Sequence, residues 1–237
     1  MANPRMRLVQ RAGFWAAAAT AVSALVSLSV AITTPPRSGP FASAPVVGYP
    51  YEAAARFVPR DFLWMYPAVV MMLAFLVLAV CVRESSGERQ VVGSIGAYLA
   101  GVSFTVIGID YFIQLRTVQP ALRRGEWEGL AVLSQYNPHG VFIALEEFGF
   151  LTLALSFGFL GFSLGASHLE RITRWVLTVS SVLVVAAFVV MSLAFGMTIE
   201  YRFEVAAIFV AWLTLIVAGA LLAVVYRRSL GGSVSGP

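Results

Sequence analysis

The sequence has no lysine, a single cysteine and few charged residues. All sixteen of its basic residues are arginine, and only 12% of the chain is charged. Without lysine, the chain can form no Schiff base with retinal or pyridoxal phosphate and no lysine-containing P-loop. With Cys81 alone, it can form no intrachain disulfide and no pair of redox-active thiols. These absences exclude several classes of enzyme and carrier before any motif is considered.

The scarcity of charge is matched by an excess of apolar residues. Hydrophobic side chains make up 59% of the chain, and its mean hydropathy is +0.83. Soluble domains are usually about 45–50% apolar and about 25% charged. We therefore expect the lipid bilayer to be the main partner of this chain. The net charge of +4 lies in loops and tails, which suits membrane orientation rather than nucleic-acid binding.

Six apolar stretches are each long enough to cross about 30 Å of hydrocarbon, which takes roughly 20 helical residues. They lack the period-two alternation of barrel strands, so we predict helices. The predicted fold is an all-α, polytopic membrane helix bundle that forms one integral membrane domain over residues 1–237. Its six transmembrane helices are predicted at Phe14–Ile32, Phe62–Val82, Val91–Leu115, Val141–Leu164, Val176–Met197 and Val205–Tyr226.

The first stretch follows three arginines and could instead be a signal peptide. Its apolar run from Ala12 to Thr34 is longer than the core of a typical signal peptide, which favours a retained helix. An even number of spans places both termini on the same side. The all-arginine composition suggests a bacterial source and therefore the cell (plasma or inner) membrane.

Arginine density predicts cytoplasmic N- and C-termini, because basic residues concentrate in cytoplasmic segments. With this orientation the inner segments are short and hold nine arginines: Arg5, Arg7, Arg11, Arg83, Arg89, Arg171, Arg174, Arg227 and Arg228. The outer segments are longer and hold seven: Arg37, Arg56, Arg60, Arg116, Arg123, Arg124 and Arg202. Two long outer connections, Thr33–Asp61 and Arg116–Gly140, could cap a site or could be tolerated surface loops.

Three carboxyl groups fall inside predicted spans. Asp110 lies roughly 9 Å, and Glu146 and Glu147 roughly 10 Å, from the outer ends of their helices, at 1.5 Å per residue. Ionisable groups at such depth are costly and usually functional. Three acids at one level therefore predict a site that binds a proton, a cation or a cationic solute. The competing interpretation is that the acids only hold helices together.

Helical phase suggests which acid faces the protein. Glu147 shares a face with small residues, including Gly158, so we expect it to face a neighbouring helix, with Glu146 near the edge of a groove. Gln114 follows Asp110 by one turn and could hydrogen-bond it, and Tyr111 lies alongside. His139 is expected at the outer surface, as a pH-sensitive ligand or as an ordinary interface histidine.

Glycines also predict where helices approach closely. Gly101 and Gly158 lie on stripes of small residues, which could pack helices within the bundle or join copies into a homo- or hetero-oligomer. The sequence indicates no metal site and no cofactor. Three functions remain open: a carrier or binding protein for a proton, cation or cationic solute; an enzyme that acts on a lipid-like substrate with two carboxyl groups; or a structural subunit.

Overall fold

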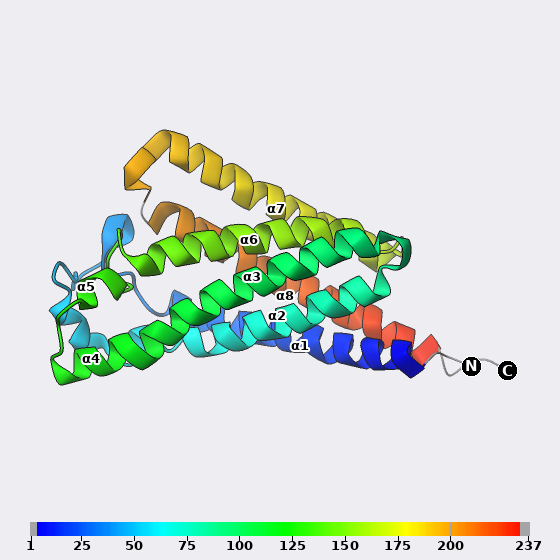
Figure 1. Cartoon of the computed structure of the whole chain (residues 1–237), viewed down its shortest axis with the longest axis horizontal. Coiled ribbons are helices and arrows are strands. Elements are labelled where there is room, and N and C mark those ends of the chain that lie inside the picture. The colour runs from blue at the N-terminus through cyan, green and yellow to red at the C-terminus, as the bar shows by residue number, and fades with distance from the viewer. Residues whose placement is uncertain (1–3, 200, 233–237) are drawn as a thin grey trace.

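The computed structural model describes residues 4–199 and 201–232, and it confirms the all-α bundle. Six of its helices are long and apolar enough to cross a membrane, and no strand occurs among the described residues. Figure 1 shows these helices running side by side, with both chain ends at the same end of the bundle. The six helices are α1 (Pro4–Ile32), α2 (Met65–Ser85), α3 (Gln90–Ile113), α6 (Val141–Ser163), α7 (His168–Phe195) and α8 (Tyr201–Gly232).

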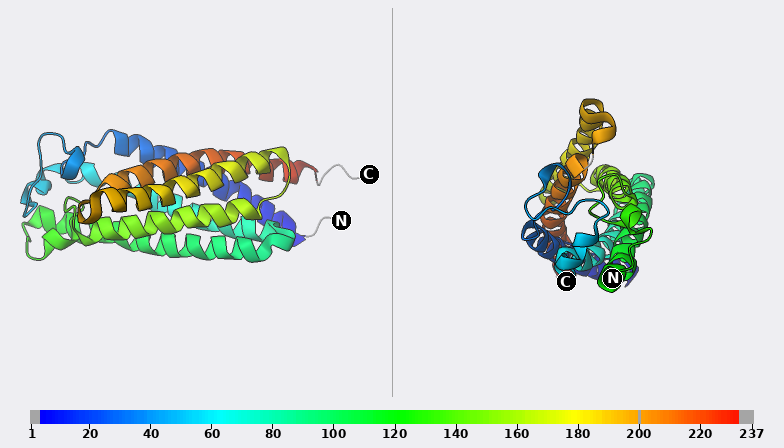
Figure 2. Two further views of the ribbon diagram at one scale, coloured as in Figure 1. Left: turned by 90° about the horizontal axis from the view of Figure 1, so that it is seen from above. Right: turned by 90° about the vertical axis from the view of Figure 1, so that its left-hand side faces the viewer.

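Five of the six helices form a compact group, and α7 stands apart. Helix α1 packs between α2 and α8, while α3 packs between α2 and α6. Helix α7 contacts α6 and α8, but it diverges from α6 along its length and protrudes from the bundle in Figure 2. The apolar face of α7 is therefore largely left to lipid.

Several helices begin earlier than hydropathy alone predicts. Helix α1 begins at Pro4 rather than Phe14, and α7 begins at His168 rather than Val176. The first turn of α7 is fixed by a capping box: Glu170 N–H donates to Ser167 Oγ at 3.4 Å, and Ser167 N–H donates to Glu170 Oε2 at 3.1 Å. Hydropathy locates the hydrocarbon-spanning part of a helix, whereas capping decides where the helix begins.

Helix α3 continues beyond its predicted end. A π-turn at Gln114–Val118 joins it to the short helix α4 (Gln119–Arg124). Pro120 lacks an N–H and crowds the preceding turn, so a wider turn just before it relieves the clash.

The end of the bundle opposite the termini is covered by the two long connections, and we call it the loop end. The α1–α2 connection contains short 3-10 helices at Gly39–Phe41, Glu52–Phe57 and Arg60–Phe62, and the other connection contains α5 (Leu130–Leu133). The two connections are joined at Asp61, whose backbone carbonyl accepts a hydrogen bond from Gln135 Nε2 at 3.4 Å. The same carbonyl also accepts from Trp64 Nε1 at 3.0 Å.

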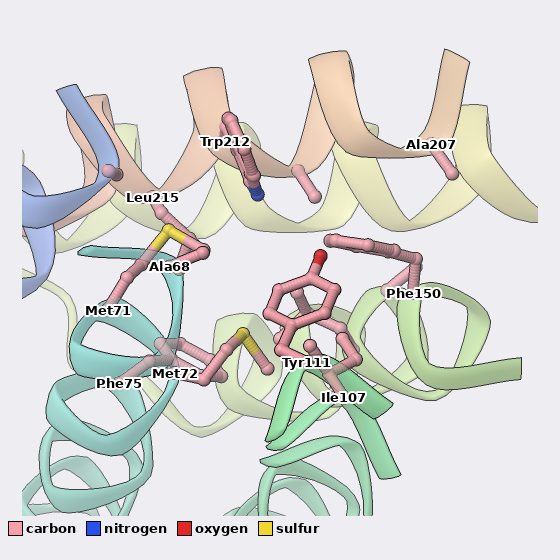
Figure 3. Close-up of a cluster of buried hydrophobic side chains, with 14 of the residues drawn as sticks. Ala68, Met71, Met72, Phe75, Ile107, Tyr111, Phe150, Ala207, Trp212 and Leu215 are labelled. Carbon is pink, nitrogen blue, oxygen red and sulfur yellow. The ribbon is translucent and has the colours of Figure 1, made fainter. Parts of the chain in front are cut away.

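The middle of the bundle is tightly packed and apolar. Figure 3 shows Met71, Met72 and Phe75 of α2 facing Trp212 of α8, with Tyr111 of α3 between them and Phe150. All of these side chains are buried. The Tyr111 hydroxyl points from α3 toward α8 in this view. This apolar layer separates the loop end from the end that carries the termini.

The glycine prediction is confirmed for Gly158 and wrong for Gly101. A Cβ at Gly158 would lie 2.9 Å from Ser181 Oγ of α7, whereas a Cβ at Gly101 would meet nothing nearer than Leu76 Cδ1 at 3.9 Å. Helix α3 contacts α6 through a different face: at Gly149 of α6, a Cβ would lie 2.4 Å from Ile107 Cγ1. At Gly96 of α3, a Cβ would lie 2.7 Å from Leu160 Cγ of α6, so the close approach of the two helices depends on glycines of both.

Candidate functional site at the loop end

Glu146 is the centre of the acidic cluster. Its side chain is fully buried, and the Tyr111 hydroxyl donates to Glu146 Oε1 at 2.5 Å. Tyr111 is itself fully buried and lies between aromatic neighbours: Trp64, at a ring-centroid distance of 5.1 Å, and Phe142, at 6.1 Å. The hydrogen bond is thus shielded from water and joins α3 to α6.

Glu204, near the start of α8, is the second member of the cluster. It is buried, and its carboxyl group lies next to that of Glu146, close enough for a hydrogen bond when one of the two is protonated. An ionised carboxylate has no donor, so this contact requires a proton on one of the two groups. Apart from this contact, no group of the described chain donates to the buried Oε2 of either residue. Glu146 and Glu204 are therefore placed to share a proton, and we call them the carboxyl pair.

Asp110 and Glu147 lie around this pair. Both are within electrostatic range of Glu146 and Glu204. Asp110 is buried, with Oδ2 lacking a donor among the described residues. The three acids predicted from the sequence thus lie near one another, together with a fourth that the sequence did not single out.

The structure reverses the predicted order of Glu146 and Glu147. Glu146 is buried, whereas Glu147 is only half-buried. The small-residue face that carries Glu147 is covered by α7 at Gly158 and Gly161, where a Cβ would meet α7 atoms at 2.9 Å and 3.0 Å. Because α7 diverges from α6 toward the loop end, the same face is less covered at Glu147 (Figure 1).

Gln114 and His139 do not join the acid cluster. Gln114 is buried, donates from Nε2 to the Leu133 carbonyl at 2.5 Å and accepts from Gln135 N–H at 3.3 Å, so it fastens the α5–α6 connection rather than Asp110. His139 is exposed, and its N–H donates to Asn137 Oδ1 at 3.0 Å. Of the six residues predicted for the site, Asp110, Tyr111, Glu146 and Glu147 are brought together.

A cavity of about 280 Å³ lies at the loop end, next to the carboxyl pair. Glu204 is part of its wall, but Asp110, Glu146 and Glu147 are not. The wall is completed by residues of α1, α6, α8 and both long connections: Ala31, Thr34, Pro35, Pro36, Arg37, Ser38, Phe41, Asp61, Trp64, Gln135, Tyr136, Phe142, Tyr201 and Val205. Glu204 thus connects the acidic cluster to a cavity large enough for a small ligand.

A buried ion pair forms another part of the cavity wall. Arg37 Nε donates to Asp61 Oδ2 at 2.7 Å, and both side chains are about 96% buried or more. The Arg37 guanidinium also lies 3.6 Å from the centroid of the Phe57 ring. Tyr136 donates its hydroxyl to Asp61 Oδ2 at 2.9 Å, while the buried Asp61 Oδ1 has no donor among the described residues. The cavity is therefore bordered by a carboxylate of which one oxygen has no donor among the described residues.

Two tyrosines complete the polar part of the wall. Burial, with the neighbouring Asp61 carboxylate second, raises the pKa of Tyr136 well above its usual range, so its hydroxyl remains a neutral donor at physiological pH. The Tyr201 hydroxyl donates to the Gln135 carbonyl at 2.7 Å and lies 2.9 Å from Ser38 Oγ. The ring of Tyr201 packs on Gly39, whose φ of +70° and lack of Cβ allow this contact.

Sequence reasoning missed Arg37, Asp61 and Glu204 as site residues. They lie at the edges of the apolar stretches, where charged residues are ordinary, so no periodicity marks them. A weak signal was available for Glu204, which directly precedes the apolar stretch that begins at Val205. Arg202, two residues before Glu204, donates from its guanidinium to the Thr198 carbonyl at 2.8 Å and lies over the Phe195 ring.

The described residues contain no group of three or more His, Cys, Asp or Glu side chains placed to hold a metal ion. Comparison with known protein families, curated proteins and solved structures finds no match for this chain. The class that the fold defines is therefore a multi-pass membrane protein with six membrane-spanning helices.

Proposed function

We propose that this chain is a carrier or binding protein of the cell membrane that takes up a proton or a small cationic solute at its loop end. The loop end faces the cell exterior in this proposal, because the arginine-dense short segments lie at the opposite end of the bundle. The observation that carries the proposal is the contact between Glu146 and Glu204, with Glu204 also forming part of the cavity wall.

The carboxyl pair couples proton binding to cation binding. With one shared proton, Glu146 and Glu204 carry a single negative charge, which the Tyr111 hydroxyl helps to hold. A cation that enters the cavity beside Glu204 stabilises the ionised form, so the shared proton can leave. The other acids facing the pair are Asp110 and Glu147, which favour a bound positive charge when ionised, while Tyr201 contributes a neutral hydroxyl.

Release to the other side of the membrane would require a change of conformation. A second cavity of about 220 Å³ lies at the opposite end, with Gln10, Ser85, Glu170 and Tyr226 in its wall. The apolar layer of Met71, Phe75 and Trp212 separates the two cavities. Binding at the loop end therefore needs no movement, whereas transport needs the helices to part at this layer.

Infrared titration of the purified protein tests the proposal. The carboxylic-acid C=O band of a buried, protonated carboxyl group is expected near neutral pH in the wild type. Glu146→Gln and Glu204→Gln should each weaken that band, while Glu126→Gln, at an exposed position, should leave it unchanged. A wild-type protein whose acids all titrate near pH 4, roughly the range of free carboxyl groups, would overturn the proposal.

A further inference from the structure

We propose that the loop-end cavity binds an organic ammonium group, either of a free solute or of a lipid headgroup. The inference rests on the proposed function, since Glu204 supplies the negative charge. It goes further by naming the chemical class of the ligand. Three independent features of the cavity wall support it: its aromatic rings, its unused carboxylate oxygen and its size.

Aromatic side chains form much of the wall. Trp64, Tyr136, Phe142, Tyr201 and Phe41 all border the cavity. The negative face of an aromatic ring attracts a cation, and sites of this kind recognise quaternary and methylated ammonium groups. A small inorganic ion would instead need several oxygen ligands to replace its hydration shell. The wall is therefore better suited to an organic cation with a weakly held hydration shell.

Two carboxyl groups provide charge and hydrogen bonding among these rings. Asp61 is neutralised by Arg37, so its free Oδ1 acts chiefly as an acceptor for an N–H or a polarised C–H group. Glu204 has no arginine partner among the described residues and shares a proton with Glu146. A cation in the cavity beside Asp61 and Glu204 would balance the negative charge that remains there.

The dimensions and position of the cavity limit the ligand further. A volume of about 280 Å³ is at the small end for ligand sites, so it admits an ammonium head but not a long chain. The cavity lies where α1 meets α8, and Phe41 and Val205 of its wall are also exposed on the outside of the bundle. A lipid headgroup could thus enter from the membrane, and a free solute from the water.

Arg37 does not turn the cavity into an anion site. Its Nε is engaged by Asp61, and its guanidinium plane lies against Phe57. Together the Arg37–Asp61 pair and the proton-sharing Glu146–Glu204 pair leave a net negative charge. A cation is therefore the favoured occupant, and an anion is an outcome that the experiment can detect.

Calorimetric titration of the full chain in detergent tests the proposal, with choline as the probe. The matched control ligand is 3,3-dimethyl-1-butanol, in which a carbon replaces the charged nitrogen. We expect choline to bind and the neutral alcohol to bind at least tenfold more weakly. Equal binding of both compounds, or binding of chloride or acetate in preference to choline, would overturn the inference.

Variants locate the binding. Glu204→Gln and Trp64→Leu should each weaken choline binding at least tenfold, while Trp175→Leu, at an exposed position on α7, should not change it. If Trp64→Leu does not fold, Phe41→Leu replaces it, because Phe41 is half-exposed and its loss should leave the fold intact. Choline binding that survives both Glu204→Gln and the loss of the aromatic ring would overturn the inference.

Nanodiscs separate the two sources of the ligand. If a lipid headgroup is the natural occupant, phosphatidylcholine nanodiscs should abolish choline binding that phosphatidylglycerol nanodiscs retain. If a free solute is the occupant, choline should bind equally in both, and both results support an ammonium site. Absence of choline binding in detergent and in both nanodiscs would overturn the inference, while the infrared band would still decide the proton site separately.

Discussion

At the residue scale, the loop-end site consists of a few buried polar groups whose partners come from distant parts of the chain. Glu146 is held by Tyr111 from α3 and by Glu204 from α8, and Asp61 is held by Arg37 and Tyr136. Each contact satisfies a group that would be costly to leave alone in a medium of low polarity. Removing one partner of such a contact should therefore lower the free energy of unfolding more than replacing both partners.

The first prediction concerns Tyr111. Tyr111→Phe should lower the free energy of unfolding by about 1–3 kcal/mol, because Glu146 Oε1 loses its only hydroxyl donor inside the bundle. Thermal unfolding in detergent measures the effect. Tyr98→Phe, an exposed position on the same helix, is the control and should change the midpoint little. Equal effects of the two changes would mean that the Tyr111 hydroxyl contributes nothing.

The second prediction concerns the buried ion pair. Arg37→Met should destabilise the protein by about 3–5 kcal/mol, because Asp61 would be left as an uncompensated buried charge. The double change Arg37→Met with Asp61→Asn should recover part of this loss. Arg123→Met, at an exposed position, serves as the control in the same unfolding assay. A double variant no more stable than the single one would argue against the ion pair as the cause.

At the element scale, α3 and α6 form the close pair that presents Asp110, Tyr111 and Glu146. Ser103 Oγ donates to the Gly149 carbonyl at 2.8 Å, and Ser156 Oγ donates to the Gly96 carbonyl at 2.7 Å. Small residues at the contact let the two backbones approach closely enough for these hydrogen bonds. These two hydrogen bonds thus join α3 and α6 on both sides of the midpoint of the helix pair.

The third prediction tests this packing. Gly149→Leu should destabilise the bundle by about 1–3 kcal/mol or more, because even its Cβ would lie 2.4 Å from Ile107 Cγ1. Gly101→Leu should cost much less, since the nearest atom to a Cβ there is 3.9 Å away. Val189→Leu on the lipid-facing part of α7 provides a further control. Similar midpoints for the Gly149 and Gly101 variants would contradict the packing described here.

At the scale of the whole molecule, the two ends of the bundle differ in the residues and connections that they carry. The loop end carries the cavity, the ion pair and the carboxyl pair, while the other end carries both termini and the short α2–α3 and α6–α7 connections. Proton or cation uptake from one side of a membrane requires such an asymmetry. Which end faces the cytoplasm then determines the direction from which the site is reached.

The fourth prediction fixes that direction. In a Cys81→Ala background, cysteine introduced at Ser85 or Ser229 should be labelled by a membrane-impermeant reagent only after the cells are opened. Cysteine introduced at Ser43, in the α1–α2 connection, should be labelled in intact cells. All three positions are exposed. The reverse labelling pattern would invert the orientation and would place the cavity on the cytoplasmic side.

The sequence by itself determined the all-α class and the number of long apolar helices, and it predicted the depth of three acids. These follow from local properties, because a run of about 20 apolar residues must span the membrane as a helix and depth follows from the rise per residue. It also placed Asp110, Tyr111 and Glu146 near one another, since oppositely directed helices bring equal depths together.

The tertiary structure decided which groups meet. Whether Glu146 or Glu147 is buried depends on the angle between α6 and α7, which no local pattern encodes. Glu204, Arg37 and Asp61 enter the site only because α8 and the α1–α2 connection fold over the same end of the bundle. The depth of a residue in the membrane depends on its position along one helix. The partner of a buried charge depends on how several helices pack together, and that packing exists only in the folded chain.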